Sequence, residues 1–483
     1  MWIPHTIPKT TFNLFCPANE VMLLPNEIGR AIKSDDFSWA NQMPKALKYM
    51  CLDSISENFQ KFPKDLFKKI NLMNTVYLSE KLPTSLSLVL VIHVPDGEYW
   101  KRRCNDFWPN FSELHNNSVE SFKVAFISEY VSQTIENLVP GYVDKQELTE
   151  ILLICNPYIT TLNCKKLCIP GSLLHEMDIA ESGELPEDPV HVELDFILHH
   201  LPRLREVKLV YGMKSCIEED YTPDQFKFNI KDMDTLGQGL VTLPYLSSLS
   251  IVKSALDVIK FNRLSLYLSN CHLLEHLDFS YCLLETLAAK SISNFIKFAK
   301  MLKSINLFCN DIGPEGAEAL AYVALWRGQN YLPNLDLNLG MNKICDLGAQ
   351  YLASAIASGV QPFSALRISN CMITQNGGLK IIESIQYDQG LKILQLDNNF
   401  IGLKAGVELH KILIRNTNIE YLSTYNCGLT IKLQKFLAKV AFYNKYKKRS
   451  ILDYTNIEEL IKTETESKES VHQINQFEED TKT

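Results

Sequence analysis

The stretch Leu302-Lys-Ser-Ile305-Asn-Leu307-Phe-Cys-Asn310-Asp-Ile312 decides the fold of this 483-residue chain. Its residues fit the pattern Leu-x-x-Leu-x-Leu-x-x-Asn/Cys-x-Leu at every defined position. Alternate residues of a strand point to opposite faces, so the pattern predicts a short strand with one buried face. An Asn or Cys directly after the strand fits a tight turn, where a small polar side chain can satisfy a buried backbone group.

The same pattern returns along the chain with a period of about 28 residues, which indicates a repeat array. Residues 363–373 and 391–401 are two further good copies. The Asn/Cys position falls, at spacings of 28, 28, 32, 29, 28 and 28 residues, on Ser254, Cys282, Asn310, Asn342, Cys371, Asn399 and Cys427. Upstream, residues 204–209 and 159–169 are predicted to form two divergent turns with long insertions between them.

A small residue and then an apolar residue follow the Asn/Cys position, as in the pairs Gly316 with Leu320 and Gly348 with Leu352. This spacing predicts a helix that approaches the strand layer closely at its small residue. Because a helix is wider than a strand, the stack should curve with parallel strands on the concave side and helices outside. The chain resembles the ribonuclease-inhibitor subclass of leucine-rich repeats, an α/β solenoid shaped like a horseshoe.

Three regions are predicted along the chain. Residues 1–150 do not repeat and should form a helical N-terminal domain that caps the solenoid, since an uncapped array exposes its core. Residues 151–445 form the leucine-rich-repeat solenoid. Residues 446–483 contain a basic cluster and then an acidic tail that we expect to be flexible. The cluster, which starts at Lys445, either binds an acidic partner such as tubulin or is a solvated helix end.

Composition narrows the class of protein. The net charge of −8 disfavours a surface for nucleic acid or anionic membrane that covers the whole molecule. Thirteen cysteines, most of them in apolar periodic segments, are expected to be reduced core thiols. The N-terminus has two prolines and no apolar stretch long enough for a signal peptide. We therefore expect a soluble intracellular protein.

Motifs for catalysis, cofactors and metals are missing from the sequence. It has no Gly-Lys dipeptide, and therefore no phosphate-binding P-loop. The segment that starts at Asp232-x-Asp234 resembles a calcium loop, but Leu236 and Leu243 stand where ligands belong. The pair His199-His200 is interpreted as surface or packed histidines. We therefore predict that the chain is not an enzyme and binds no cofactor or metal.

The remaining candidate site is the surface formed by the outward strand positions. Aromatic side chains exposed on a rigid sheet are typical anchors for protein partners, although scattered exposed aromatics are also normal. The predicted partner-binding residues on the concave face are Asp278, Tyr281, Asn306, Phe308, Arg367, Gln395, Asp397, Tyr421 and Tyr425.

A resemblance to a known family narrows the choice of function. The segment Glu98-Tyr99-Trp100-Lys101-Arg102-Arg103-Cys104, followed by Trp108, resembles the Tyr-Trp-Lys-Arg-x-Cys-x-x-x-Trp motif of the dynein regulatory complex subunit 5 family, also called T-complex-associated testis-expressed protein 1. A helix predicted at 47–62, a second at 122–138 and the repeats come in the same order as in that family. The motif residues themselves are expected to pack locally.

The resemblance implies a structural, non-catalytic subunit of the nexin link between doublet microtubules in the axoneme of motile cilia. Its partners would be other dynein regulatory complex subunits and doublet microtubules, in a hetero-oligomeric assembly. Two alternatives stay open. One is a GTPase-activating solenoid of the Ran activator type, and the other is a cytosolic inhibitor that wraps one soluble target. Neither alternative requires the tryptophan motif and its flanking helices.

Overall fold

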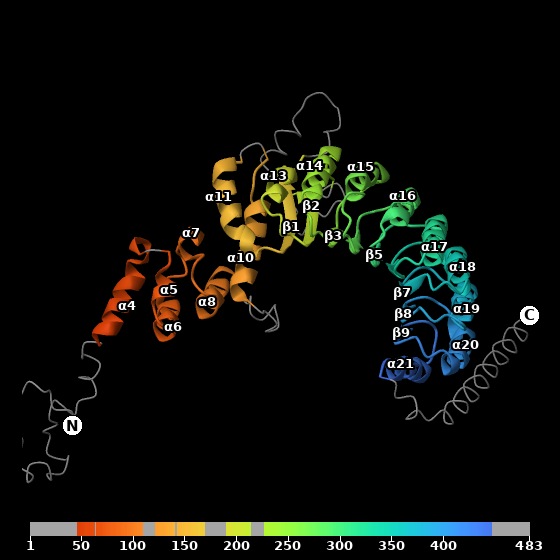
Figure 1. Ribbon diagram of the computed structural model, residues 1–483. Helices are drawn as coiled ribbons and strands as arrows, with labels where there is room; N and C mark the ends of the chain where they lie inside the picture. Colours follow the sequence, from red (N-terminus) through yellow and green to blue (C-terminus); the bar gives the residue numbers. More distant parts are fainter. Residues whose placement is uncertain are drawn as a thin grey trace, which may run out of the picture. The chain divides into compact units, whose positions relative to one another are not determined.

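The computed structural model describes residues 46–62, 64–109, 121–140, 143–169, 190–213 and 227–446 (Figure 1). The chain divides into two compact units between Pro109 and Asn110. The sequence-based boundary was drawn between 150 and 151, so residues 121–150 group with the solenoid. The basic cluster from 447 onward and the acidic tail lie outside the described residues.

The first unit is helical. Its helices are α4 (Leu47–Glu57), the 3₁₀ turn η3 (Phe59–Lys61), α5 (Leu66–Lys69), α6 (Leu72–Lys81), α7 (Leu88–Val91) and α8 (Glu98–Phe107). Leu52, Leu66 and Leu78 form one of its buried clusters. The helix predicted at 47–62 is therefore shorter than expected, because the chain tightens into a 3₁₀ turn after Asn58.

The tryptophan motif forms α8 and packs locally, as expected. Tyr99 and Trp100 are fully buried, and the Trp100 indole donates to the carbonyl of Val94 at 3.1 Å. Arg102 donates to the carbonyls of Ser79 and Leu82, at 3.0 and 3.1 Å, near the end of α6. The motif thus fastens α8 to the preceding helix and loop.

The second unit contains nine parallel strands in sequential order. The strands are β1 (Thr161–Ile169), β2 (Glu206–Met213), β3 (Ser248–Ile251), β4 (His276–Asp278), β5 (Ser304–Asn306), β6 (Leu335–Asn338), β7 (Phe363–Arg367), β8 (Ile393–Gln395) and β9 (Tyr421–Ser423). The two divergent upstream turns predicted from sequence are β1 and β2. The leucine-rich-repeat α/β solenoid is thereby confirmed.

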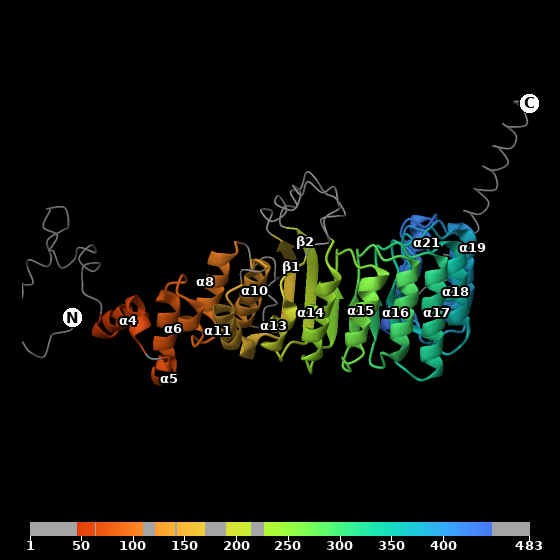
Figure 2. The ribbon, with the colours of Figure 1, turned by 90° about the horizontal axis from the view of Figure 1, so that it is seen from above.

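A helix accompanies each strand. The helices of this unit are α10 (Phe122–Glu136), α11 (Lys145–Cys155), the 3₁₀ turn η4 (Asn156–Tyr158), α13 (Leu194–His199), α14 (Ile230–Val241), α15 (Val258–Leu268), α16 (Thr286–Phe298), α17 (Pro314–Gln329), α18 (Cys345–Ala357), α19 (Gln375–Ser384), α20 (Gly402–Arg415) and α21 (Ile431–Lys445). Within this unit the strands line the inner side of the arc and the helices its outer side (Figure 1). Figure 2 shows α14 to α18 side by side in a row.

The core runs along the array as a ladder of paired apolar side chains. One buried residue of each strand lies in register with its neighbours: Leu162, Val207, Leu249, Leu277, Ile305, Leu337, Leu366, Leu394 and Leu422. The helices reach this layer through their small residues. A Cβ at Gly348 would lie 2.5 Å from Cγ2 of Ile344 and 3.2 Å from Cβ of Ala317. Glycine therefore permits the close approach that the sequence predicted.

Helix α10 covers the edge of the sheet at β1. The amide of Asn163 donates to the Ser132 hydroxyl at 3.3 Å, and the amide of Lys165 donates to Glu136 at 2.5 Å. These bonds satisfy donors that an open edge strand would leave unpaired. At the other end, the Asn444 side chain of α21 donates to the carbonyl of Ile419 at 2.8 Å. Each end of the described array is thus covered by a helix.

Candidate binding surface

The Asn/Cys position of each repeat is an internal hydrogen-bonding centre. The Asn399 amide nitrogen donates to the carbonyls of Ile368 and Leu396 at 2.7 and 2.8 Å. Its amide oxygen accepts from the backbone amides of Cys371 and Ile373 at 2.9 and 3.2 Å. One buried side chain thus satisfies four backbone groups that water cannot reach. Asn310 and Asn342 bond to the backbone in the same manner.

Cysteine performs part of this role in three other repeats, at Cys282, Cys371 and Cys427. The Cys371 thiol lies 3.1 Å from the carbonyl of Leu339, and the Cys282 thiol lies 3.1 Å from that of Ile251. Burial raises the pKa of each of these two thiols to about 12, so both keep the proton that points at the carbonyl. The ten cysteines that the structure describes are all free thiols.

The residue just before this position has a left-handed backbone in seven consecutive repeats. These residues, with φ between 50° and 58°, are Lys253, Tyr281, Cys309, Met341, Asn370, Asn398 and Asn426. The amides of the first six donate to a carbonyl of the next repeat, as in Met341 to Ser369 at 2.8 Å. The left-handed conformation aims each amide along the array. It is therefore a property of the fold and not of any one side chain.

Apolar side chains occupy some left-handed positions just before or just after the Asn/Cys position. Asn adopts this conformation readily, whereas a bulky apolar residue does so at a conformational cost. Four exposed residues in the loops after β4, β6 and β7 are apolar and left-handed, and we call them the loop ridge: Tyr281, Leu283, Met341 and Met372. They are 45, 59, 42 and 64% exposed, so burial in the core does not explain them.

The predicted partner-binding residues lie on the strands and loops β4 to β9. Tyr281, Tyr421 and Tyr425 are exposed, at 45, 50 and 71%. The other six are half-buried: Asp278, Asn306, Phe308, Arg367, Gln395 and Asp397. The prediction that Phe308 is solvent-exposed is thus wrong in part, because its ring packs 5.5 Å from that of Tyr281. The structure brings these two aromatics together.

Several of the polar residues in the predicted site bond within the array. The Asp278 carboxylate accepts from the backbone amide of Ser280 at 2.9 Å, and the side-chain Oδ1 of Asn306 accepts from the backbone amide of Phe308 at 3.1 Å. Asp397 accepts from the Ser423 hydroxyl at 2.5 Å and the Tyr425 amide at 2.7 Å. These groups shape the loops, and their side chains are only partly available to a partner.

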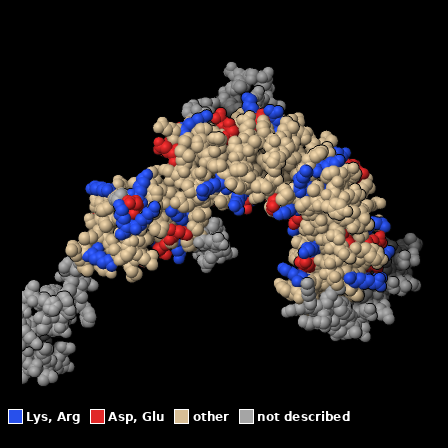
Figure 3. Space-filling model, viewed as in Figure 1, with Lys and Arg blue, Asp and Glu red and all other residues tan. Residues whose placement is uncertain are grey.

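Charged side chains on the strands and just before them pair between neighbouring repeats. Arg367 on β7 pairs with Asp336 on β6. Lys303 pairs with Glu275 at 2.8 Å, and Lys392 with Glu420 at 3.3 Å. Figure 3, which has the view of Figure 1, shows basic and acidic side chains interspersed on the side of the solenoid that faces the viewer. Such pairs between exposed groups contribute little to stability, so they define the pattern of charge that a partner meets.

Sequence reasoning missed Leu283, Met341 and Met372. The search followed the alternation of strand residues, whereas these three residues lie in the loops. A usable signal was present, because each is an apolar residue one place before or after the Asn/Cys position. Asn398 and Asn426 at the equivalent loop position indicate a left-handed backbone there.

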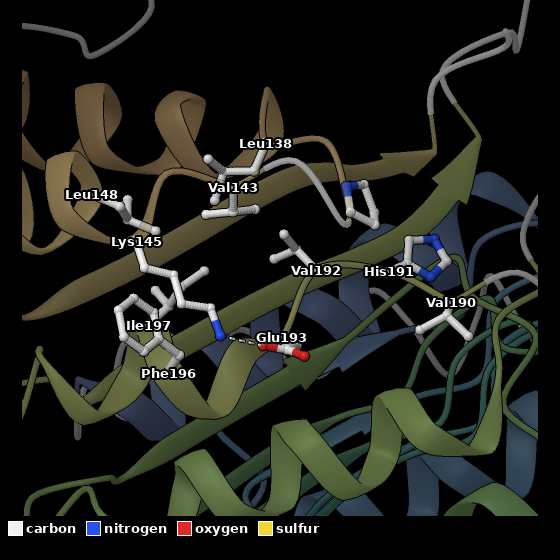
Figure 4. A pocket seen from close by; sticks show the side chains of 11 residues that line it. Leu138, Val143, Lys145, Leu148, Val190, His191, Val192, Glu193, Phe196 and Ile197 are labelled. Carbon is white, nitrogen blue, oxygen red and sulfur yellow. Dashed lines mark hydrogen bonds and ion pairs between the residues drawn. The ribbon is translucent and has the colours of Figure 1, made fainter. Parts of the chain in front are cut away.

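A separate cavity of about 350 Å³ lies in the second unit, beside α11 and α13 (Figure 4). Its lining is mostly apolar, and Lys145 is paired with Glu193 at 3.0 Å across it. His191 is buried, with Nδ1 3.1 Å from Asp232 and Nε2 3.3 Å from the carbonyl of Gly212. Both ring nitrogens face acceptors, so this histidine fastens the chain at 190–193 to the sheet. The residues that line the cavity include no serine or cysteine nucleophile.

The two acidic residues of the rejected calcium loop have structural partners. Asp232 accepts from the Asn229 and His191 amides, at 3.0 and 2.8 Å, at the start of α14. Asp234 pairs with Arg263 on the next helix. Among the described residues, no group of three or more His, Cys, Asp and Glu side chains could hold a metal ion. No helix in the described part of the chain is long and apolar enough to span a membrane.

Comparisons with known proteins agree with the repeat and with the family resemblance. A family model described as leucine-rich repeat matches residues 299–321. Dynein regulatory complex subunit 5 of Macaca fascicularis is 25% identical over 303 residues, which are 61% of this chain and 59% of that protein. The Homo sapiens protein of the same name is 26% identical over 261 residues, 52% of this chain and 51% of that protein.

A ribonuclease inhibitor from Sus scrofa is 25% identical over 202 residues, 36% of this chain and 44% of that protein. An internalin structure from Listeria monocytogenes covers 62% of this chain and 82% of its own, at 14% identity and a TM-score of 0.30. The chain spans only about half to three-fifths of the length of the dynein regulatory complex proteins it matches. It is a leucine-rich-repeat protein that is similar in sequence to dynein regulatory complex subunit 5.

Proposed function

We propose that this chain is a non-catalytic structural subunit of the nexin-dynein regulatory complex in the axoneme of motile cilia. The similarity to dynein regulatory complex subunit 5, over up to 61% of the chain, carries the proposal. The chain would act as a protein-binding scaffold in the link between doublets that regulates dynein. Its place is then the axonemal cytoskeleton within the cytoplasm, away from membranes and nucleic acids.

The architecture supports a scaffold because the array is stiff. Each strand is bonded to its neighbours, and the side chain of Asn310, Asn342 or Asn399 bridges successive loops. A surface held this firmly loses little conformational freedom when it binds, so more of the contact energy appears as affinity. Partners would be other subunits of the complex and doublet microtubules.

We assign partner contacts to the nine predicted concave-face residues together with the loop ridge. Tyr281 belongs to both sets and packs on Phe308, which gives a continuous aromatic surface across two repeats. Aromatic side chains supply large contact area with few rotatable bonds. The half-buried polar residues around them, such as Gln395, would supply hydrogen bonds at the rim.

The proposal is tested by tagging the full chain in a ciliated cell and isolating demembranated axonemes. We expect the chain to stay with the doublets, and its loss to remove density from the nexin link. A chain that is fully released by detergent while the link stays intact would contradict the proposal. It would favour the GTPase-activating or inhibitor alternatives, which predict stimulated hydrolysis by a small GTPase or a tight one-to-one soluble complex.

The assignment of the concave face has its own test. Replacing Phe308 and Tyr425 by Ala should leave the fold intact and weaken co-purification of axonemal partners. Tyr425 is the cleaner site, since its ring is 71% exposed and its removal leaves no cavity. Unchanged co-purification by a folded double variant would remove the concave face from the proposal.

A further inference from the structure

Helix α21 (Ile431–Lys445) closes the described array and has two different faces. Leu433, Leu437, Val440 and Ala441 are buried against the last repeat. The opposite face carries Lys432, Lys435 and Lys439, followed by the exposed aromatics Phe442 and Tyr446. The two aromatic rings lie 4.7 Å apart. We call these five residues the basic face of α21.

The charge of the basic face is concentrated and of one sign. Some exposed lysines elsewhere in the solenoid pair with carboxylates, as Lys411 does with Glu408 and Lys343 with Asp311, and others, such as Lys290 and Lys404, form no ion pair with a described residue. None of the three lysines of the basic face forms an ion pair with any residue that the structure describes. The stretch 421–452 contains seven basic residues and no acidic one. The face is therefore complementary to an acidic, partly apolar partner.

A segment with that chemistry follows in the chain. The sequence Asp-Tyr-Thr-Asn-Ile-Glu-Glu-Leu-Ile-Lys-Thr-Glu-Thr-Glu at 453–466 has five acidic residues and one lysine. Tyr454, Ile457 and Ile461 supply apolar side chains among the acidic residues. We call 453–466 the acidic segment; it lies outside the described residues.

The acidic segment and the basic face belong to one chain, and this covalent connection favours their binding to each other. Residues 447–452 join α21 to the acidic segment, and six residues can span up to about 20 Å. That reach is enough for the linker to reverse the direction of the chain, so that the acidic segment itself can lie along α21, a helix of 15 residues that is about 22 Å long. A ligand tethered this closely has an effective concentration on the order of millimolar. Charge pairs that are individually weak then suffice to keep the acidic segment bound to the basic face.

We propose that the acidic segment docks on the basic face of α21. Its carboxylates face Lys432, Lys435 and Lys439, and its apolar residues cover Phe442 and Tyr446.

Photo-crosslinking in the full chain tests the contact. Phe442→p-benzoylphenylalanine places a reactive group on the basic face, and the crosslinked peptides are identified by mass spectrometry at several protein concentrations. We expect crosslinks to residues 453–466 within one molecule, with a yield that does not depend on concentration. Crosslinks between molecules would overturn the intramolecular proposal and indicate a second copy as the occupant.

Charge reversal then tests the chemistry. K432E/K435E/K439E should lower the crosslink yield about tenfold, because attraction becomes repulsion at several pairs. The control K290E/K300E/K404E makes the same change in net charge at exposed lysines elsewhere in the array, and should leave the yield within about twofold. Adding E458K/E459K/E464K to the first triple variant should restore the yield.

The restoration separates a direct contact from a damaged helix, since a misfolded α21 cannot be repaired by changes in another segment. Equal loss in both triple variants, or a complete lack of crosslinks to 453–466 in the original chain, would overturn the proposal. Crosslinks to an acidic axonemal polypeptide, with none to 453–466, would overturn it in favour of a partner as the occupant.

Discussion

Asn399 and Asn398 are neighbours in one loop and have opposite environments. Asn399 is 1% exposed and bonds to four backbone groups, whereas Asn398 is exposed with a left-handed backbone. In the loop after β6 the equivalent pair is Asn342 and Met341. The interior position is restricted to Asn, Cys or Ser in every copy, but the outer position varies. The fold therefore restricts which residue can occupy the interior position, whereas the residue at the outer position can vary and is available for binding.

The largest expected effect is at the interior position. Asn399→Ala should lower the free energy of unfolding by about 2–4 kcal/mol, because it leaves buried carbonyls and amides without partners. Chemical denaturation measures the change. Asn399→Cys is the matched control, since Cys371 and Cys427 occupy the same position and donate to the carbonyl. Equal losses of unfolding free energy in the Ala and Cys variants would contradict the proposal that the interior side chain acts through its hydrogen bonds.

A pH dependence tests the cysteine version of the interior position. Burial raises the pKa of Cys282 and Cys371 to about 12, above the unfolded value. The folded state therefore holds these protons more tightly. The stability they contribute is complete below about pH 8.5 and declines as the pH rises toward 12. At about pH 10 the loss is on the order of 2 kcal/mol per thiol.

Urea unfolding across this pH range measures that decline. The variant Cys371→Ser is the control, because Ser254 already occupies an equivalent position and donates to the carbonyl of Val252 at 2.8 Å. We expect its stability to fall less steeply with pH. Identical slopes for the two chains would show that the thiol proton has no part in the stability.

The outer position should respond in the opposite direction. Met341→Asn relieves the conformational cost of a left-handed backbone and should raise the free energy of unfolding by about 1 kcal/mol. The reverse change, Asn398→Met, should lower it by about the same amount. Thermal unfolding of the two variants measures both. If Met341→Asn destabilises the chain, its side chain serves packing rather than binding.

The sequence was sufficient for the repeat and for most of the strands. The Asn/Cys positions from Ser254 to Cys427 all lie where the consensus placed them, because each is required by the backbone bonds of its own loop. Even the divergent strands β1 and β2 were found, since their buried residues keep the alternation. Residues close together in the sequence determine these elements, so the sequence pattern was enough to locate them.

The division of the chain and the full binding surface were not predictable in this way. Residues 122–136 read as part of an N-terminal domain, yet α10 bonds to β1 through Ser132 and Glu136. Such contacts join segments about 30 residues apart and leave no periodic signal. The loop ridge was missed for a similar reason, because backbone conformation, not alternation, directs its side chains outward.

The measurement that tests the central claim most directly pairs stability with retention on axonemes. The full chain carrying Leu283→Asn, Met341→Asn and Met372→Asn is compared with the original chain for its unfolding midpoint and for the fraction kept on demembranated axonemes. The account predicts an equal or higher midpoint together with retention reduced at least about tenfold, as expected when several anchors are lost. Unchanged retention by this folded variant would contradict the claim that these loops form the binding surface of the scaffold.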